Sequence, residues 1–112
     1  YHDVRFEYLY VEDFLKIVEH FINNPAKFKS YNIGNGLPIS LVELASKIEK
    51  ISKKKLSITT ENPGMNKEYT CDNFRLVAEL SGFKFMELDI ALASLYNWYR
   101  GNFNSINKNF FQ

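Results

Sequence analysis

The turn Gly34-Asn35-Gly36 is the first place in this sequence where residue types and spacing point to a binding chemistry. It follows an apolar stretch and precedes a helical pattern, as the glycine-rich loop of a dinucleotide site does. That loop needs a third glycine where Ile39 stands, and an acid about twenty residues further on, where the lysines 53–55 stand instead. We therefore assign no cofactor-binding residue here and expect the glycines to provide turn geometry.

Candidate catalytic groups are few and scattered. His2 and His20 have no serine or cysteine nucleophile at a familiar spacing. Cys71 is the single cysteine, so it forms no internal disulfide, and both histidines are too distant in sequence for a Cys-rich zinc site. The acids lie within or beside predicted helices, where capping and solvation explain Glu12, Asp13, Glu43, Glu49 and Glu79. We assign no catalytic and no metal-binding residue, and the pattern favours a binding domain.

The composition narrows the function classes. With 112 residues, 46% of them hydrophobic, the chain has room for one folded domain. A formal net charge of +1 gives no strong attraction to nucleic acid or to an anionic membrane. The lysines between positions 47 and 55 fit the solvated end of a helix better than a phosphate site. No apolar run approaches the ~20 residues that span a bilayer, and a lone thiol is typical of a reducing compartment, so we expect a cytoplasmic protein.

Hydrophobic periodicity predicts the elements that position these residues. Residues 5–11 are rich in aromatic and β-branched types and predict a strand. A helix should follow and end before Pro25, because its apolar stripe comprises Phe14, Ile17, Val18, Phe21 and Ile22. Residues 28–33 predict a second strand, which the glycine turn closes.

The second half of the chain continues the alternation. Ser40 and Glu43 form a capping box, and the helix that they open should reach about residue 52. Residues 56–60 alternate with period two and predict a third strand, followed by a polar loop over 61–67.

Two further helices are expected. Asp72 or Asn73 should cap a short helix that ends near Leu80, and the last helix covers about 87–100. The predicted class is α/β, an α+β-like fragment with a small three-strand sheet and about four helices. We expect one domain over residues 1–100 and a tail over 101–112.

Several segments resemble motifs of the extended short-chain dehydrogenases/reductases, the NAD-dependent nucleotide-sugar epimerase and dehydratase family. Residues 7–14, Glu-Tyr-Leu-Tyr-Val-Glu-Asp-Phe, are similar to its Arg-Asp-Phe-Ile-(Tyr/His)-Val-Asp-Asp element. Residues 31–45, from Tyr-Asn-Ile-Gly-Asn-Gly to Leu-Ala, look like the second hallmark of its C-terminal half. Residues 69–76 and 82–85 resemble its Tyr-x-x-Asp-x-x-(Arg/Lys) helix and the Gly-(Phe/Trp)-x-Pro stretch that follows, and 90–99 its final helix.

The resemblance implies a fold in which an N-terminal Rossmann domain binds NAD or NADP and a smaller C-terminal part closes over a nucleotide-diphosphate sugar. This chain begins at Tyr1 rather than Met, and we expect it to be an excised piece that lacks the Rossmann domain. It also lacks the family's glycine-rich loop and catalytic Tyr-x-x-x-Lys, so the piece alone should be inactive. The apolar side that would pack on the missing domain should favour a homodimer.

By motif position, the resemblance implies the substrate-binding residues Arg5, Tyr8, Leu37, Asn66 and Tyr69. Tyr8 matches an aromatic residue beside the nucleotide, Leu37 an apolar residue after the glycine turn, and Tyr69 an aromatic residue near the base or ribose. Ordinary packing between layers is the alternative for both tyrosines.

Phosphate recognition is where the sequence departs from the family pattern. The family arginine that pairs with the diphosphate falls at Phe6, while Arg5 stands next to it. A shift of one residue on a strand turns a side chain to the opposite face, so either the strand carries a bulge or phosphate is recognised differently. Asn66 or Lys67 is the substitute for a second phosphate-binding arginine in the loop.

Two other functions stay open at this point. The chain could belong to a non-catalytic relative that binds a nucleotide or a partner as a sensor. It could also be a structural or interaction domain without a ligand. Which sugar, nucleotide and reaction are involved depends on residues that the motifs do not contain.

Overall fold

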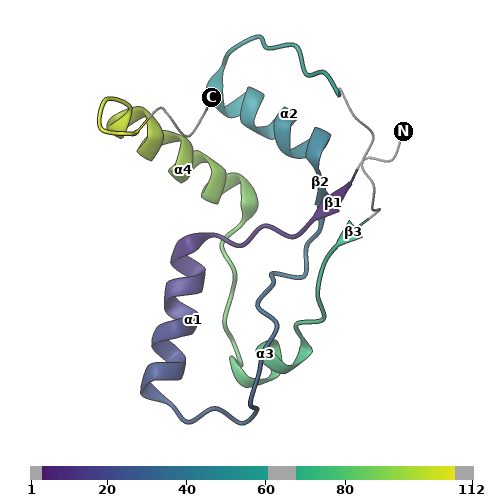
Figure 1. Ribbon diagram of the computed structural model, residues 1–112, viewed down its shortest axis with the longest axis vertical. Helices are drawn as coiled ribbons and strands as arrows, with labels where there is room; N and C mark the ends of the chain where they lie inside the picture. Colours follow the sequence, from purple (N-terminus) through teal and green to yellow (C-terminus); the bar gives the residue numbers. More distant parts are fainter. Residues whose placement is uncertain (1–3, 61–67, 108–112) are drawn as a thin grey trace.

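The computed structural model describes residues 4–60 and 68–107, which form three short strands and four helices (Figure 1). In chain order the elements are β1 (Arg5–Phe6), α1 (Val11–Asn23), β2 (Ile39–Ser40), α2 (Leu41–Ser52), β3 (Glu68–Tyr69), α3 (Phe74–Glu79) and α4 (Leu88–Asn102). The expected α/β class, with a small three-strand sheet and four helices, is confirmed. Within the described residues, no helix is both long and apolar enough to cross a membrane.

The sheet has the strand order β2-β1-β3. β1 pairs antiparallel with β2, with Phe6 opposite Ile39, and parallel with β3, with Phe6 opposite Tyr69. A hydrogen bond from the Glu7 N–H to the Tyr69 carbonyl, at 3.3 Å, continues the parallel pairing past the end of β1. The sheet therefore brings three sequence-distant segments to one place.

Two of the three predicted strands are wrong, and the first is shorter than predicted. Residues 28–33 and 56–60 form no strand, and β1 ends at Phe6 rather than at residue 11, where α1 already begins. The observed β2 lies between the glycine turn and the predicted helix that Ser40 caps, and β3 directly follows the loop predicted over 61–67. Strands of two residues are selected by their pairing partners rather than by local β-propensity.

Helix α1 forms where the apolar spacing predicts it. Asp13 supplies negative charge to its first turn, which the helix dipole favours, and Ile17 is buried on the inner side. The helix ends at Asn23, and the Asn24 N–H donates to the His20 carbonyl at 2.9 Å just before Pro25.

Helices α2 and α4 lie side by side (Figure 1). The predicted cap of α2 is confirmed, because the Ser40 hydroxyl accepts the Glu43 N–H at 3.1 Å. Lys53 ends α2 in the left-handed conformation, with φ 56°. An ion pair of 2.7 Å between Lys47 and Asp89 joins the two helices, and α4 runs two residues further than the predicted residue 100.

A small core lies between α1 and α3. Its buried centre consists of Ile17, Leu76 and Leu80, and partly buried aromatic residues such as Phe21 and Phe83 pack around it. The radius of gyration is 16.7 Å, whereas a compact domain of this length has about 13 Å. The chain is therefore less compact than a typical domain of its length, and many of its large apolar side chains are exposed.

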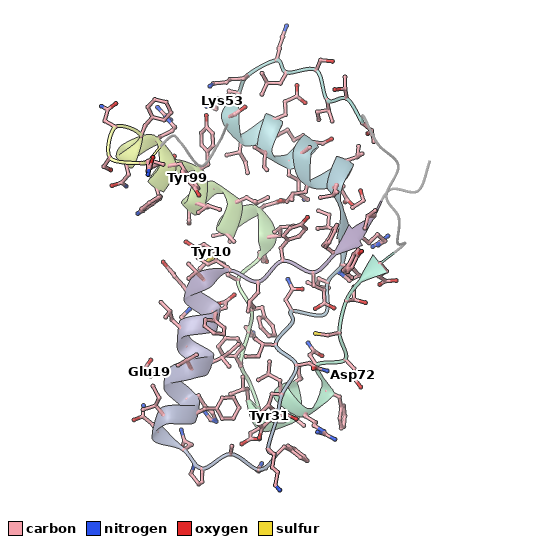
Figure 2. The ribbon with its side chains drawn as sticks, in the orientation of Figure 1. Tyr10, Glu19, Tyr31, Lys53, Asp72 and Tyr99 are labelled. Atoms are coloured by element: carbon pink, nitrogen blue, oxygen red, sulfur yellow. The ribbon has the colours of Figure 1, made fainter. Side chains whose placement is uncertain are left out.

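The segment that was predicted as the second strand is held by side chains instead (Figure 2). The Tyr31 hydroxyl donates to the Glu79 carboxylate on α3 and accepts the Phe28 N–H at 2.9 Å. Lys27 donates its N–H to the other Glu79 oxygen at 3.1 Å. The Tyr31 hydroxyl thus satisfies the backbone N–H of Phe28, which a strand would have paired in a ladder.

The same pair shifts two pKa values in opposite directions. Burial raises the pKa of Tyr31, and the hydrogen bond to Glu79 raises it further. Burial tends to raise the pKa of Glu79, but the hydrogen bonds from Tyr31 and Lys27 outweigh it and hold that pKa below its ordinary value. The interpretation of Glu79 as a merely solvated acid is therefore wrong.

Candidate ligand-binding site

Three aromatic rings lie together on one side of the sheet, and we call Phe6, Tyr8 and Tyr69 the aromatic face. The Phe6 and Tyr69 rings stack with centroids 4.9 Å apart and planes 6° from parallel. Tyr8 lies 6.1 Å from Phe6 with its ring tilted by 48°. The parallel pairing sets Phe6 abreast of Tyr69, and the alternation of side chains along an extended chain puts Tyr8 on the same side as Phe6.

Tyr8 also lines a cavity of about 250 Å³ between the segment before α1 and helices α2 and α4. Most of its wall is apolar, as Leu44 of α2 and Leu92 and Leu95 of α4 show. Burial raises the pKa of the Tyr8 phenol above its ordinary 10.0, and the hydroxyl is a hydrogen-bond donor at neutral pH with or without this shift. Tyr8 therefore belongs both to the aromatic face and to the wall of this apolar cavity.

Asn35 positions Leu37 beside this region. Its side-chain amide donates to the Tyr8 carbonyl at 2.9 Å, and its Oδ1 accepts the Leu37 N–H at 2.9 Å. The Leu37 side chain is 71% exposed and does not line the cavity. Sequence reasoning missed Asn35 as a site residue, although an asparagine between two glycines is typical of a turn that binds its own backbone.

The glycine turn does not fit a dinucleotide phosphate. The Glu7 carboxylate lies beneath the turn, where it accepts the Gly36 N–H at 3.3 Å and the Cys71 N–H at 3.4 Å. A Cβ at Gly34 would overlap a Glu7 oxygen and lie 2.7 Å from the Cys71 sulfur. Because the Glu7 carboxylate accepts the Gly36 N–H, this N–H is not free to bind a dinucleotide phosphate.

The Cys71 thiol shares this acidic environment. Burial raises its pKa, and the nearby charges of Glu7 and Asp72 raise it further. The thiol therefore stays protonated near neutral pH and is a poor nucleophile. Among the described residues, no group of three or more His, Cys, Asp or Glu side chains is placed to hold a metal ion.

Arg5 lies on the side of the sheet opposite the aromatic face. Its guanidinium donates to the Pro38 carbonyl at 2.8 Å, and its strand partner in β3 is Glu68. Both residue pairs of β1 are in regular register with each neighbour, so β1 contains no bulge that would turn Arg5 around. Asn66 lies outside the described residues.

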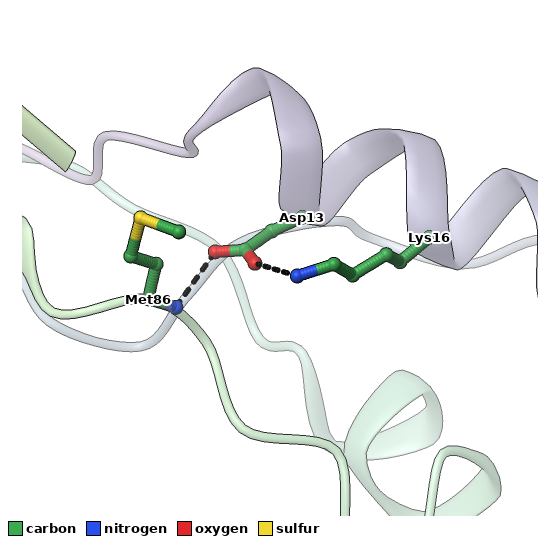
Figure 3. A network of polar contacts seen from close by, with 3 residues as sticks. All are labelled: Asp13, Lys16 and Met86. Carbon is green, nitrogen blue, oxygen red and sulfur yellow. Dashed lines mark hydrogen bonds and ion pairs between the residues drawn. The ribbon is translucent and has the colours of Figure 1, made fainter. Parts of the chain in front are cut away.

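Asp13 is the buried acid of the site region (Figure 3). It is 2% exposed, so the interpretation of this acid as a solvated helix residue is wrong. Its Oδ2 accepts the Met86 N–H at 2.8 Å, and its Oδ1, which accepts no hydrogen bond from the described residues, faces the Lys16 ammonium at 3.8 Å. Asp13 and Met86 both line the cavity, so this bond fixes part of its wall.

A comparison with known proteins gives one relative. Over 89 residues the chain is 30% identical to UDP-glucuronate 4-epimerase 5 of Arabidopsis thaliana, and the matched part is 75% of this chain and 20% of the relative. The chain is similar to part of an epimerase. It spans about a fifth of the length of that relative. No protein-family model matches the chain, and no solved structure matches it.

This similarity to an epimerase agrees with the resemblance of the sequence motifs to the nucleotide-sugar epimerase and dehydratase family. The structure brings two of the predicted site residues, Tyr8 and Tyr69, into one aromatic cluster through Phe6. Leu37 is linked to Tyr8 by two hydrogen bonds of the Asn35 side chain. Arg5 lies on the other side of the sheet. Whether these residues bind a substrate stays a prediction.

Proposed function

We propose that the chain is the substrate-binding part of an NAD(P)-dependent nucleotide-sugar epimerase, dehydratase or reductase. The similarity to part of a UDP-glucuronate 4-epimerase supports this class. The residues that bind NAD or NADP and the catalytic groups lie outside this chain, because the Glu7 carboxylate occupies the glycine turn and the sequence contains no Tyr-x-x-x-Lys. When bound in the whole protein, the cofactor supplies hydride transfer at the sugar, and the task of this chain is to hold the nucleotide.

The observation that carries the proposal is the aromatic face beside the cavity. Base stacking on an aromatic side chain is worth ~1–3 kcal/mol, so Tyr8 and Tyr69 together provide most of what a weak nucleotide site needs. Leu37, which is exposed and linked to Tyr8 through the side chain of Asn35, adds an apolar edge. In this proposal Arg5 and Asn66 have supporting rather than stacking roles.

An uncovered apolar side of α1 supports the idea that this part packs on another surface. Val11, Leu15 and Ile22 are exposed on one stripe of α1, away from Asp13 and Ile17. Apolar stripes of this kind mark interaction sites in soluble proteins. We assign the missing surface to a cofactor-binding domain of the same polypeptide, with residues 1–100 as the substrate part and 101–112 as its tail.

The test is a titration of the 112-residue chain with UDP-glucuronate, followed by amide chemical shifts. We expect weak binding with shifts clustered at Tyr8, Leu37 and Tyr69, because one chain provides only part of a closed site. Tyr8→Ala should reduce the affinity by about fivefold or more. Tyr99→Ala is the matched control, since Tyr99 is an exposed tyrosine of α4 that lies away from the sheet (Figure 2).

Three outcomes would contradict nucleotide binding at the aromatic face. One is the absence of shifts at saturating ligand, and another is a set of shifts scattered over the surface with no cluster at the aromatic face. The third is an equal loss of affinity in Tyr8→Ala and Tyr99→Ala. Affinity at the micromolar level or tighter would contradict the view that part of the site is missing.

A further inference from the structure

We propose that Asn35 is a positioning residue of the nucleotide-sugar site, which holds the exposed Leu37 in a fixed place relative to Tyr8. The inference rests on the proposed function and adds to that site a residue that acts on the ligand through its neighbours. It is carried by the two hydrogen bonds of the Asn35 side chain, which join segments that are distant in sequence.

The Asn35 side chain uses both of its polar atoms. Its Oδ1 accepts the Leu37 N–H at 2.9 Å, a bond to the second residue along the chain that defines an Asx turn. Its Nδ2 donates to the Tyr8 carbonyl at 2.9 Å, across 27 residues of sequence. Gly36, in the middle of the turn, has a φ of 74°, which glycine adopts at little cost. One side chain therefore sets the shape of the turn and fixes the turn to the segment that carries Tyr8.

Leu37 depends on this side chain more than Tyr69 does. The Leu37 side chain is 71% exposed, so packing restrains it little. Tyr69 is held by backbone pairing with β1, and its carbonyl also accepts the Glu7 N–H at 3.3 Å. The Glu7 carboxylate accepts the Gly36 N–H at 3.3 Å, a longer bond than either bond of Asn35. Loss of the Asn35 side chain should therefore loosen Leu37 and leave Tyr69 in place.

A fixed position of Leu37 matters for affinity because ordering a flexible segment during binding costs conformational entropy. A turn that is already ordered in the free chain avoids this cost. Leu37 can serve as the apolar edge of the site only where its distance from Tyr8 is set before the ligand arrives. Asn35 provides this preorganisation and needs no contact with the ligand.

Asn73 is the matched control for Asn35. Its Nδ2 donates to the Gly34 carbonyl of the same turn at 2.8 Å, and this bond involves neither Tyr8 nor Leu37. Both asparagines are partly buried. Removing either side chain should therefore lower the free energy of unfolding by a similar amount, because each change leaves a carbonyl of the site region without its donor.

The first experiment titrates UDP-glucuronate into the native 112-residue chain, Asn35→Ala and Asn73→Ala, followed by amide chemical shifts. Asn35→Ala should weaken the affinity by about fivefold or more, and Asn73→Ala by less than about twofold. At equal saturation of the ligand, the shift of the Leu37 amide should be lost in Asn35→Ala while that of Tyr69 remains. Urea denaturation of the three chains shows whether the two variants are equally stable.

The second experiment restores part of the turn with Asn35→Ser. A serine hydroxyl can accept the N–H of the second residue along the chain, as the asparagine Oδ1 does, although more weakly. It does not replace the donor to the Tyr8 carbonyl. Asn35→Ser should therefore bind UDP-glucuronate more tightly than Asn35→Ala and more weakly than the native chain. An affinity no tighter than that of Asn35→Ala would count against the role of the turn.

The outcomes separate this inference from the proposed function. If the native chain shows shifts at the aromatic face and Asn35→Ala binds within twofold of it, Asn35 is not a positioning residue and the proposed function stands. If Asn35→Ala and Asn73→Ala lose affinity equally, Asn35 acts only through general stability, and the inference again fails alone. If UDP-glucuronate shifts neither the aromatic face nor Leu37 of the native chain, both proposals fail.

Discussion

The carboxylate of Asp13 accepts a hydrogen bond from the backbone N–H of Met86 at 2.8 Å, across 73 residues of sequence. This bond ties the first turn of α1 to the segment that enters α4 (Figure 3). Both residues line the cavity beside Tyr8, so the hydrogen bond of this buried acid also fixes part of the cavity wall.

The first prediction concerns this bond. Asp13→Ala should lower the free energy of unfolding by about 1–3 kcal/mol, because the Met86 N–H loses its partner in a partly buried place. Urea denaturation followed by far-UV circular dichroism measures the change. Glu19→Ala is the control on the same helix, and this exposed acid should change stability by less than about 0.5 kcal/mol. Equal stability of the two variants would rule out the structural role of Asp13.

The second prediction concerns the glycine turn. Gly34→Ala should destabilise the chain by about 1–3 kcal/mol, because the added methyl group overlaps the Glu7 carboxylate and approaches the Cys71 sulfur. Gly101→Ala is the matched control in α4, where a Cβ meets nothing within 4 Å and alanine favours the helix. Thermal unfolding of both variants gives the comparison.

A second substitution separates steric overlap from other effects of Gly34→Ala. Adding Glu7→Ala removes the carboxylate that the new methyl group meets, so the double variant should lose less stability than the sum of the single changes. Strict additivity of the two changes would show that Glu7 does not limit the residue at position 34.

The third prediction concerns pH. Folding lowers the pKa of Glu79 from its ordinary 4.5, so its contribution to stability is full above that value and is lost as the pH falls through the lowered pKa. Folding raises the pKa of Tyr31 from its ordinary 10.0, so its contribution is full below that value and is lost as the pH rises through the raised pKa. Stability should therefore decline at both ends of the pH range.

The variant Tyr31→Phe tests the assignment of both declines. It removes the hydroxyl that donates to Glu79, so the acid and alkaline losses of unfolding free energy should both become smaller. Tyr99→Phe makes the same chemical change on α4 and should keep the native profile. The measurement is urea denaturation between about pH 3 and pH 11. Superimposable profiles for the native chain and Tyr31→Phe would exclude the pair as the cause.

The helices could be predicted from sequence because their signals are local. The cap of α2 at Ser40 and the stop of α1 before Pro25 depend on residues within one or two turns. The strands could not, because β1 takes its partners from residues 39–40 and 68–69, and no local pattern specifies such pairing. Residues 28–33 have β-propensity, yet the bond between Tyr31 and Glu79 directs this segment towards α3.

The same difference between local signals and long-range pairing applies to the candidate site. The motif positions of Tyr8 and Tyr69 could be assigned from the sequence, but their common contact with Phe6 depends on the parallel pairing of β1 with β3. The side on which Arg5 lies also follows from that register. Asp13 could not be recognised as buried, because an acid in the first turn of a helix has an ordinary explanation in the helix dipole.

The last prediction concerns the exposed stripe of α1. Leu15 and Ile22 are 59% and 76% exposed, and together with Val11 they fall at positions that share one side of the helix. If the chain is studied alone, this surface should drive self-association, because burying such side chains is worth ~1.5–3 kcal/mol each. The double change of Leu15→Gln and Ile22→Gln should weaken association by about tenfold or more, while Glu19→Gln on the same helix should not. Sedimentation velocity across a wide range of concentration measures the effect, and a native chain that sediments as a monomer throughout would show that the stripe needs no partner.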